Sequence, residues 1–258
     1  MENTSRGIAG IICAIIIGAS VVGGTFIVAN SFYQVKALEN VVSVTGSAQQ
    51  TITSDQVEWT STFSRNVDAM SLQAGNTQMQ ADFAAIKSYL HAHNVTDDQI
   101  TVQPLNVTTV CNDQQNVQYD KNGGVLCSAN NASGYNLQQV ITIQSPDVQG
   151  ITTLSNQASA DLIAKGLVFN TTDVEYFYSK LSDLKLQMLA AATKNAQQRA
   201  QQIVQSTGGT LGKLRTSDEG VFQLTPVNST EVSDEGEYDT ATIQKQITAI
   251  VHASFSVE

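Results

Sequence analysis

The sequence predicts an α+β fold, in which an N-terminal transmembrane helix is followed by a mainly antiparallel sheet covered by helices. Three observations lead to this prediction. An uncharged apolar run lies near the N-terminus, strand-like alternation recurs through the rest of the chain, and the strands come in adjacent pairs between a few helical patterns. Strands that follow one another directly pair most simply as antiparallel neighbours, which leaves the helices to cover one face of the sheet.

The apolar run covers residues 7–29 and contains no charged residue. At about 1.5 Å per residue it is long enough to span a hydrocarbon core of about 30 Å. A secretory signal has an apolar core of only about 7–15 residues, so an uncleaved anchor is favoured over a cleaved signal. The flanking Arg6 and Lys36 barely discriminate the orientation. We expect residues 1–36 to form the tail, anchor and linker, and residues 37–258 to form one extracytoplasmic domain.

Small residues recur four positions apart within the apolar run. This spacing allows two helix backbones to approach closely, so self-association through the small residues is one interpretation. The alternative is that Gly is simply frequent in membrane helices. The pairs are Ala14 with Gly18, Ala19 with Gly23, and Ser20 with Gly24.

The elements that follow the apolar run are predicted from their periodicity. Gly46 is a candidate bulge, Pro104 indicates an edge or a bulge, and the acidic segment 228–239 is expected to be a mobile hairpin loop. The expected strands are 41–48, 56–66, 99–110, 135–143, 168–178, 211–223 and 247–257, and the expected helices are 68–90, 151–162 and 182–207.

Composition excludes one class of partner. Charged residues make up 14% of the chain and its formal net charge is −10. Nucleic-acid binding requires a basic stripe that displaces phosphate counterions, and the sequence contains no Lys/Arg cluster. Apart from the lipid bilayer around residues 7–29 and further copies of the chain itself, the sequence predicts no particular partner.

The cysteines favour an oxidising compartment. Cys13 lies in the apolar run, whereas Cys111 and Cys127 bracket a polar stretch between two strand-like segments. We expect these two to form a disulfide that closes a long hairpin, and such a loop contributes about 3 kcal/mol in the chain-entropy model. The alternative is two unrelated free thiols. Zinc binding is not expected, because no second Cys/His pair has the required spacing.

The sequence offers no catalytic constellation. His91 and His93 are two positions apart and do not share a helix face, while His252 alternates onto the polar face of the last strand and is interpreted as a surface residue. The glycine-rich segment 208–213 fails as a phosphate loop, because the glycine spacing is too short and Leu214 stands where Ser or Thr would bind magnesium. No catalytic, cofactor-binding or metal-binding residue is therefore predicted.

Several segments occur in the order that is typical of one family. VVSVTGSA at 41–48, SDQVEWTSTF at 54–63 and DDQITVQPLNV at 97–107 resemble its early strands, Gly134-Tyr135 resembles the pair before its fourth strand, and residues 190–214 resemble its Ala-rich helix and G-x-x-L-G turn. Over roughly residues 40–258 the chain thus resembles the SIMPL-domain family of exported bacterial envelope proteins. Ser54 replaces the proline that is more usual in that family's second strand.

The resemblance implies a SIMPL-like α+β fold and a protein that is not an enzyme. It also implies a link to stress tolerance, including oxidative stress, and assembly of some members into hollow rings of many subunits. The leading hypothesis is accordingly a membrane-anchored, homo-oligomeric envelope protein. The alternative is an extracytoplasmic binding module or adhesin that uses the 111–127 and 228–239 loops.

Overall fold

The structure is a computed structural model that describes residues 18–29, 31, 40–112, 118–119, 121, 123, 125–127, 132–230 and 233–258. The predicted α+β class is confirmed, but the strands form two five-stranded sheets and a small two-stranded one instead of a single sheet. The chain divides into two compact units. The first unit comprises Met1–Gln49, Lys185–Phe222 and Thr248–Glu258, and the second unit comprises Gln50–Leu184 and Gln223–Ile247.

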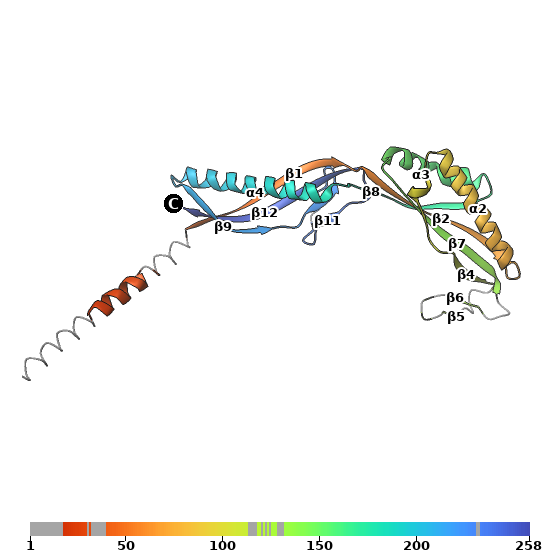
Figure 1. The fold of residues 1–258 in the computed structure, drawn as a ribbon, viewed down its shortest axis with the longest axis horizontal. Helices are drawn as coiled ribbons and strands as arrows, with labels where there is room; N and C mark the ends of the chain where they lie inside the picture. Colours follow the sequence, from red (N-terminus) through yellow and green to blue (C-terminus); the bar gives the residue numbers. More distant parts are fainter. Residues whose placement is uncertain are drawn as a thin grey trace, which may run out of the picture. The chain divides into compact units, whose positions relative to one another are not determined.

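Residues 18–29 form a helix before the first strand (Figure 1). Its apolar side chains have few neighbours: Val22 is 69% exposed, Phe26 75% and Ile27 67%. Among the described residues, no helix is both long and apolar enough to cross a membrane. Residues 7–17 of the predicted anchor, with Ala14 among them, lie outside the described part of the chain.

The first unit contains a sheet with one helix on it. Strand β12 (Gln244–Val257) lies between β1 (Val41–Thr53) and β9 (Leu211–Glu219), and its first residues belong to the second unit. Helix α4 (Leu181–Ser206) runs along these strands (Figure 1). The predicted alternation of the last strand is confirmed, because every second side chain is buried, as at Ala249 and Val251.

Helix α4 approaches the sheet closely at Gly46. Ala192, Ala196 and Ala200 are fully buried and lie four positions apart, so they share one helix face. A Cβ atom at Gly46 would overlap the carbonyl oxygen of Ala192 and would lie 2.5 Å from the backbone nitrogen of Ala196. Gly46 is therefore where the helix backbone meets the strand, a role that the sequence alone could not distinguish from a bulge.

The second unit is built on a sheet with strand order β3-β7-β2-β8, in which β4 also pairs with β7. Helices α2 and α3 cover one of its faces (Figure 1). The elements are β2 (Gln56–Asp68), α2 (Leu72–Ala92), the 3-10 turn η1 (Asp97–Gln99), β3 (Ile100–Val102), β4 (Asn106–Cys111), β5 (Gln118–Tyr119), β6 (Val125–Leu126), β7 (Ala132–Ser145), α3 (Val148–Ile163), β8 (Val168–Phe177), β10 (Gln223–Pro226) and β11 (Glu237–Tyr238).

The core of the second unit follows the predicted alternation in β2. Trp59 and Phe63 face the helices and are at most 1% exposed, and Trp59 meets Phe169 of β8 edge to face with ring centroids 6.0 Å apart. Helix α2 contributes Leu90 and helix α3 contributes Leu162, both fully buried. Burial of these side chains fixes which face of the sheet the helices cover.

The strand predicted over residues 99–110 is two strands on the edge of β7. Ile100 pairs with Ile143 and Asn106 pairs with Gln138, so β3 and β4 together contain one more residue than the length of β7 they cover. Gln103 still bonds Val140, so the extra residue lies within the pair Pro104 and Leu105, where Pro104 has no N–H to donate to a ladder. The predicted edge position and bulge are both confirmed.

The contact at Gly46 makes a stability prediction. Gly46→Val should lower the free energy of unfolding by at least about 1 kcal/mol, because the new side chain can be accommodated only if α4 moves away from β1. Urea unfolding followed by circular dichroism measures the change. Gln49→Val is the matched control on an exposed position of the same strand and should stay within about 0.5 kcal/mol of the parent. Equal stabilities of the two variants would contradict the close contact.

Candidate functional site

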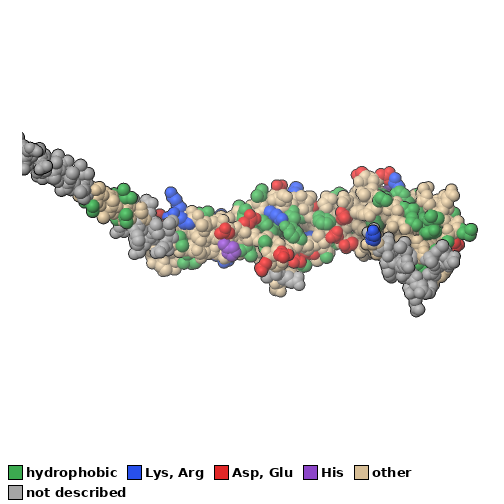
Figure 2. Space-filling view, turned by 90° about the horizontal axis from the view of Figure 1, so that it is seen from below, with side chains coloured by type: hydrophobic (Ala, Val, Ile, Leu, Met, Phe, Trp, Pro, Cys, Tyr) green, Lys and Arg blue, Asp and Glu red, His purple; other side chains and the backbone are tan. Residues whose placement is uncertain are grey.

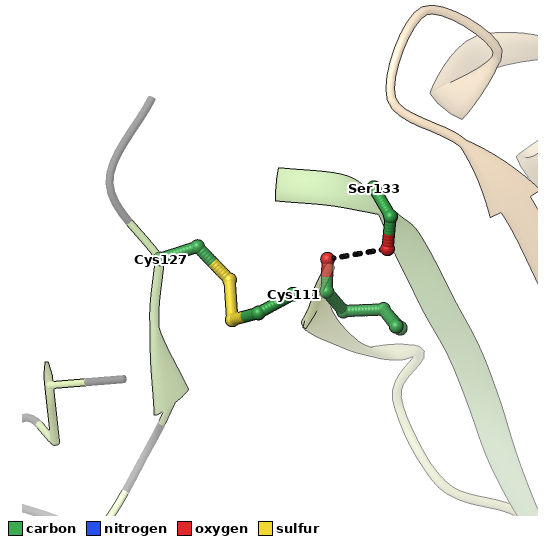
Figure 3. Close-up of a disulfide and its surroundings, with 4 residues drawn as sticks. Cys111, Cys127 and Ser133 are labelled. Atoms are coloured by element: carbon green, nitrogen blue, oxygen red, sulfur yellow. Dashed lines mark hydrogen bonds between the residues drawn. A yellow bond between two sulfur atoms is a disulfide. The ribbon is translucent and has the colours of Figure 1, made fainter. Parts of the chain in front are cut away.

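The predicted disulfide is confirmed. Cys111 ends β4 and Cys127 directly follows β6, and their Cα atoms are 5.7 Å apart (Figure 3). Beside it, the Ser133 hydroxyl donates a hydrogen bond of 2.9 Å to the carbonyl of Val110. The bond joins the antiparallel β5–β6 pair to the edge strand β4, so this loop is held by a covalent link.

The acidic segment 228–239 is not a simple hairpin. Strand β11 pairs with β10 in parallel, whereas the two arms of a hairpin are antiparallel. The side-chain amide of Gln223 donates a hydrogen bond of 2.5 Å to the backbone carbonyl of Ser233. The backbone N–H of Asp239 donates a hydrogen bond of 2.8 Å to the backbone carbonyl of Leu224. The described part of this segment is therefore fastened to β10.

A buried ion pair closes the same region. Lys245 of β12 is fully buried, and its ammonium group lies 3.4 Å from a carboxylate oxygen of Asp239. The carboxylate also accepts hydrogen bonds from the backbone N–H groups of Ala241 and Thr242 and from the Thr242 hydroxyl. Each charge has a fixed partner, so this pair is suited to holding the loop against β12.

The two pKa values agree with this role. Burial alone would raise the pKa of Asp239, but the Thr242 hydroxyl, the Ala241 N–H and the charge of Lys245 outweigh burial and leave that pKa below its ordinary value. Burial lowers the pKa of Lys245, and the attraction of Asp239 opposes this shift. The carboxylate is therefore held in its charged form.

The histidines near the end of α2 have local partners. His91 Nε2 lies 2.6 Å from a carboxylate oxygen of Asp97, whose other oxygen accepts a bond of 2.8 Å from Lys87. The bond from Lys87, followed by that from His91, lowers the pKa of Asp97. His93 packs its ring against Tyr89. Across the described ranges, no group of three or more His, Cys, Asp and Glu residues is placed to hold a metal ion.

A polar row crosses the open face of the first unit's sheet. The hydroxyl of Thr45 on β1 lies 3.0 Å from Nδ1 of His252 on β12, and Asp218 of β9 is paired with His252 on the other side. One row further, the Ser43 and Ser254 hydroxyls are 2.8 Å apart. These five residues line a shallow hollow of about 190 Å³. His252 is exposed, as predicted, but its two flanking strands could not be identified from periodicity.

The polar row places a hydroxyl beside an imidazole. A hydroxyl beside an imidazole is half of a nucleophile–base pair, and it needs donors directed at a developing oxyanion. The N–H groups of a strand lie in the plane of the sheet and face the neighbouring strands. The row is also exposed, so water competes for each contact.

A groove lies on the opposite side of β1, against α4. The guanidinium of Arg199 donates a bond of 3.1 Å to the carbonyl of Thr45, and Asn195 accepts a bond of 3.2 Å from the N–H of Ser47. Ile203 is 48% exposed and makes one end apolar. The groove has a volume of about 620 Å³ and is lined by Ser43, Val44, Thr45, Gln198, Arg199, Gln202 and Ile203.

The structure describes five of the six small residues that were singled out in the predicted anchor. Ala19 and Ser20 lie in the described helix with Gly18, Gly23 and Gly24. A Cβ atom added at any of the three glycines would meet no other atom within 4 Å. The structure thus shows open space beside these positions.

Basic side chains are few on one face of the protein. On the face shown in Figure 2, Lys and Arg side chains are scattered and do not gather into a patch. The chain has 13 Lys and Arg residues against 23 Asp and Glu residues.

The fold and these sites define an α+β protein with a disulfide-closed loop and polar sheet faces. Residues 42–255 match the family model SIMPL, described as a protein of unknown function (DUF541), and the chain belongs to this family. The resemblance found in the sequence is thereby confirmed. No curated protein matches the chain.

The buried ion pair makes a second stability prediction. Asp239→Asn should cost about 3–5 kcal/mol at pH 7, because it leaves Lys245 buried without a counter-charge. Lys245→Met should cost less, because the carboxylate of Asp239 that is left behind keeps its hydrogen bonds from the N–H groups of Ala241 and Thr242. Chemical denaturation of the three proteins measures both effects.

The same comparison has a defined pH dependence. Because the pKa of Asp239 is depressed in the folded protein, its contribution is present above the unfolded value of about 3.9 and is lost as the pH falls through the folded value. The difference between wild type and Asp239→Asn should therefore shrink below about pH 4. A difference that stays constant from pH 7 to pH 2 would refute this assignment.

Proposed function

We propose that this chain is a non-enzymatic, membrane-anchored envelope protein that exposes residues 37–258 outside the cytoplasm and assembles with further copies of itself. The observation that carries the proposal is the helix over residues 18–29. Val22 and Phe26 on this helix are 69% and 75% exposed, and the helix lies within the uncharged run 7–29. Apolar surface of this kind is stable only when lipid or protein covers it.

The disulfide supports the location. A bond such as Cys111–Cys127 forms and persists in oxidising compartments and is rare in the cytosol. With the anchor in the bilayer, the domain that carries this bond belongs on the extracytoplasmic side.

Two features support assembly. Open space lies beside Gly23 and Gly24, so a second anchor helix has room to approach there. In the described part of the chain, β9 pairs with β12 alone and therefore keeps an unpaired edge.

The polar groups favour a structural role over a chemical one. Thr45 contacts His252, Ser43 contacts Ser254, and the carboxylate of Asp239 is bonded to its own loop and to Lys245. Groups held by one another in this way stabilise a fold and need no substrate to complete their hydrogen bonds.

Fractionation of cells that express the full chain tests the proposal. The protein should stay in the membrane pellet after an alkaline wash, external protease should digest its C-terminal domain, and detergent-solubilised particles should have several times the 27.6 kDa mass of one chain. Val22→Asp with Phe26→Asp should release the protein, because each acidic residue costs about 2.5–3.5 kcal/mol at the centre of a membrane helix.

The matched control replaces the same two residues with leucine and should remain in the pellet. Release of the wild-type protein by the wash would refute the anchor. A single-chain mass in mild detergent would refute the assembly.

A further inference from the structure

We propose that the groove between β1 and α4 binds a long-chain fatty acid, with the carboxylate at Arg199 and the hydrocarbon chain on Val44 and Ile203. This ligand goes beyond the proposed function, although its source, the bilayer, rests on the proposed anchor. The groove lies wholly within the first unit. Its volume of about 620 Å³ is typical of small-ligand sites, which measure about 300–1,000 Å³.

The walls of the groove follow from the way α4 lies along β1. Arg199 and Ile203 are four positions apart on α4, so both side chains project from the same face of the helix. Val44 precedes Gly46 by two positions on β1, and Gly46 is the residue that meets the backbone of α4. Because side chains two positions apart share a face of a strand, Val44 points to the side of the sheet that carries α4.

Arg199 supplies the charged end of the groove. Its guanidinium donates one hydrogen bond of 3.1 Å to the carbonyl of Thr45. A guanidinium group has five N–H donors in a planar fork that matches a carboxylate, so the bond to Thr45 can orient the group while other donors remain for a ligand. The N–H of Thr45 points to the same side of the strand as its carbonyl and therefore also faces the groove.

The charge of the groove has one sign. Among the described residues that line it, Arg199 carries the only charge, and the others are Ser, Thr, Gln, Val and Ile. An anionic group bound there meets no opposing carboxylate in the lining. The charge therefore favours an anion over a cation or a zwitterion.

The apolar end lies one helical turn further along α4. Ile203 is 48% exposed, and covering such a side chain with hydrocarbon is favourable. At about 1.5 Å per residue, Ile203 is about 6 Å from Arg199 along the helix axis. The order of charge and then apolar surface is that of the head and chain of a fatty acid. An acidic peptide would satisfy Arg199 but would place polar backbone groups against Ile203.

The anchor brings the groove close to a source of this ligand. The described helix 18–29 is followed by Ser43 of the groove after 14 residues. An extended chain spans at most about 3.6 Å per residue, so the groove lies within about 50 Å of the end of the anchor. This distance is close to the thickness of one bilayer with its headgroups, about 40–45 Å.

Photo-crosslinking of the full chain in phosphatidylcholine nanodiscs tests the inference. The probes are palmitic acid and hexadecanol, each with a diazirine near the end of its chain, at about pH 8.5, where the acid is ionised. Palmitic acid should label the residues that line the groove in a saturable manner. Hexadecanol should need an at least about tenfold higher concentration for half-maximal labelling, because it cannot form a charge-assisted bond with Arg199.

Three variants separate the two ends of the groove. Arg199→Gln should weaken labelling by palmitic acid at least about tenfold and leave labelling by hexadecanol unchanged. Ile203→Asn should weaken labelling by both probes, because both chains lose the same apolar contact. Lys194→Gln is the matched control, since it removes a charge from an exposed position of α4 that does not line the groove, and it should behave as wild type does. All three positions are exposed, so the circular dichroism spectra should stay unchanged.

Labelling outside the groove, or an Arg199→Gln variant that affects both probes equally, would overturn the inference. If Ile203→Asn lowers the particle mass while palmitic acid fails to label the groove, another copy of the chain occupies it, and the lipid is overturned. If an alkaline wash releases the wild-type protein, the same labelling is measured in aqueous buffer. Groove labelling there would refute the anchor alone, and its absence would overturn the ligand as well.

Discussion

The contact between α4 and β1 at Gly46 is the constraint on which the first unit depends. A helix backbone can approach a strand this closely only where both surfaces lack bulk, and the alanines of α4 and the missing side chain of Gly46 provide that. The approach carries Asn195 and Arg199 to the outer edge of β1, where they reach the backbone of Ser47 and Thr45. The missing side chain of Gly46 thus allows two polar side chains of α4 to bond the backbone at the outer edge of β1.

Both units use polar residues to build flat, solvated faces. In the second unit, Thr60 contacts Thr142 across β2 and β7, and Thr62 contacts Thr172 across β2 and β8. Ser43 and Ser254 form a similar pair in the first unit. Cross-strand hydroxyl pairs contribute modestly to the stability of a sheet, and they carry no charge. This chemistry explains how a chain with only 14% charged residues covers large sheet faces.

The sequence was sufficient for features that depend on local pattern. The alternation of β12, the helix that ends at Ser206 before Gly208, and the spacing of Cys111 and Cys127 were each readable from a single segment. Strand partners were not readable, because alternation reports which face is buried and does not report which strand lies alongside. For the same reason, the Thr45–His252–Asp218 row and the parallel β10–β11 pair were missed.

Strands β1 and β12 also determine when the first unit can fold during synthesis. The two are separated by nearly the entire second unit in the chain, yet each contributes residues to both units. During synthesis, β1 has no partner until β12 has been made, and contacts between such distant segments form slowly. The first unit therefore stays incomplete, with the apolar residues of β1 uncovered, until both ends of its sheet are present.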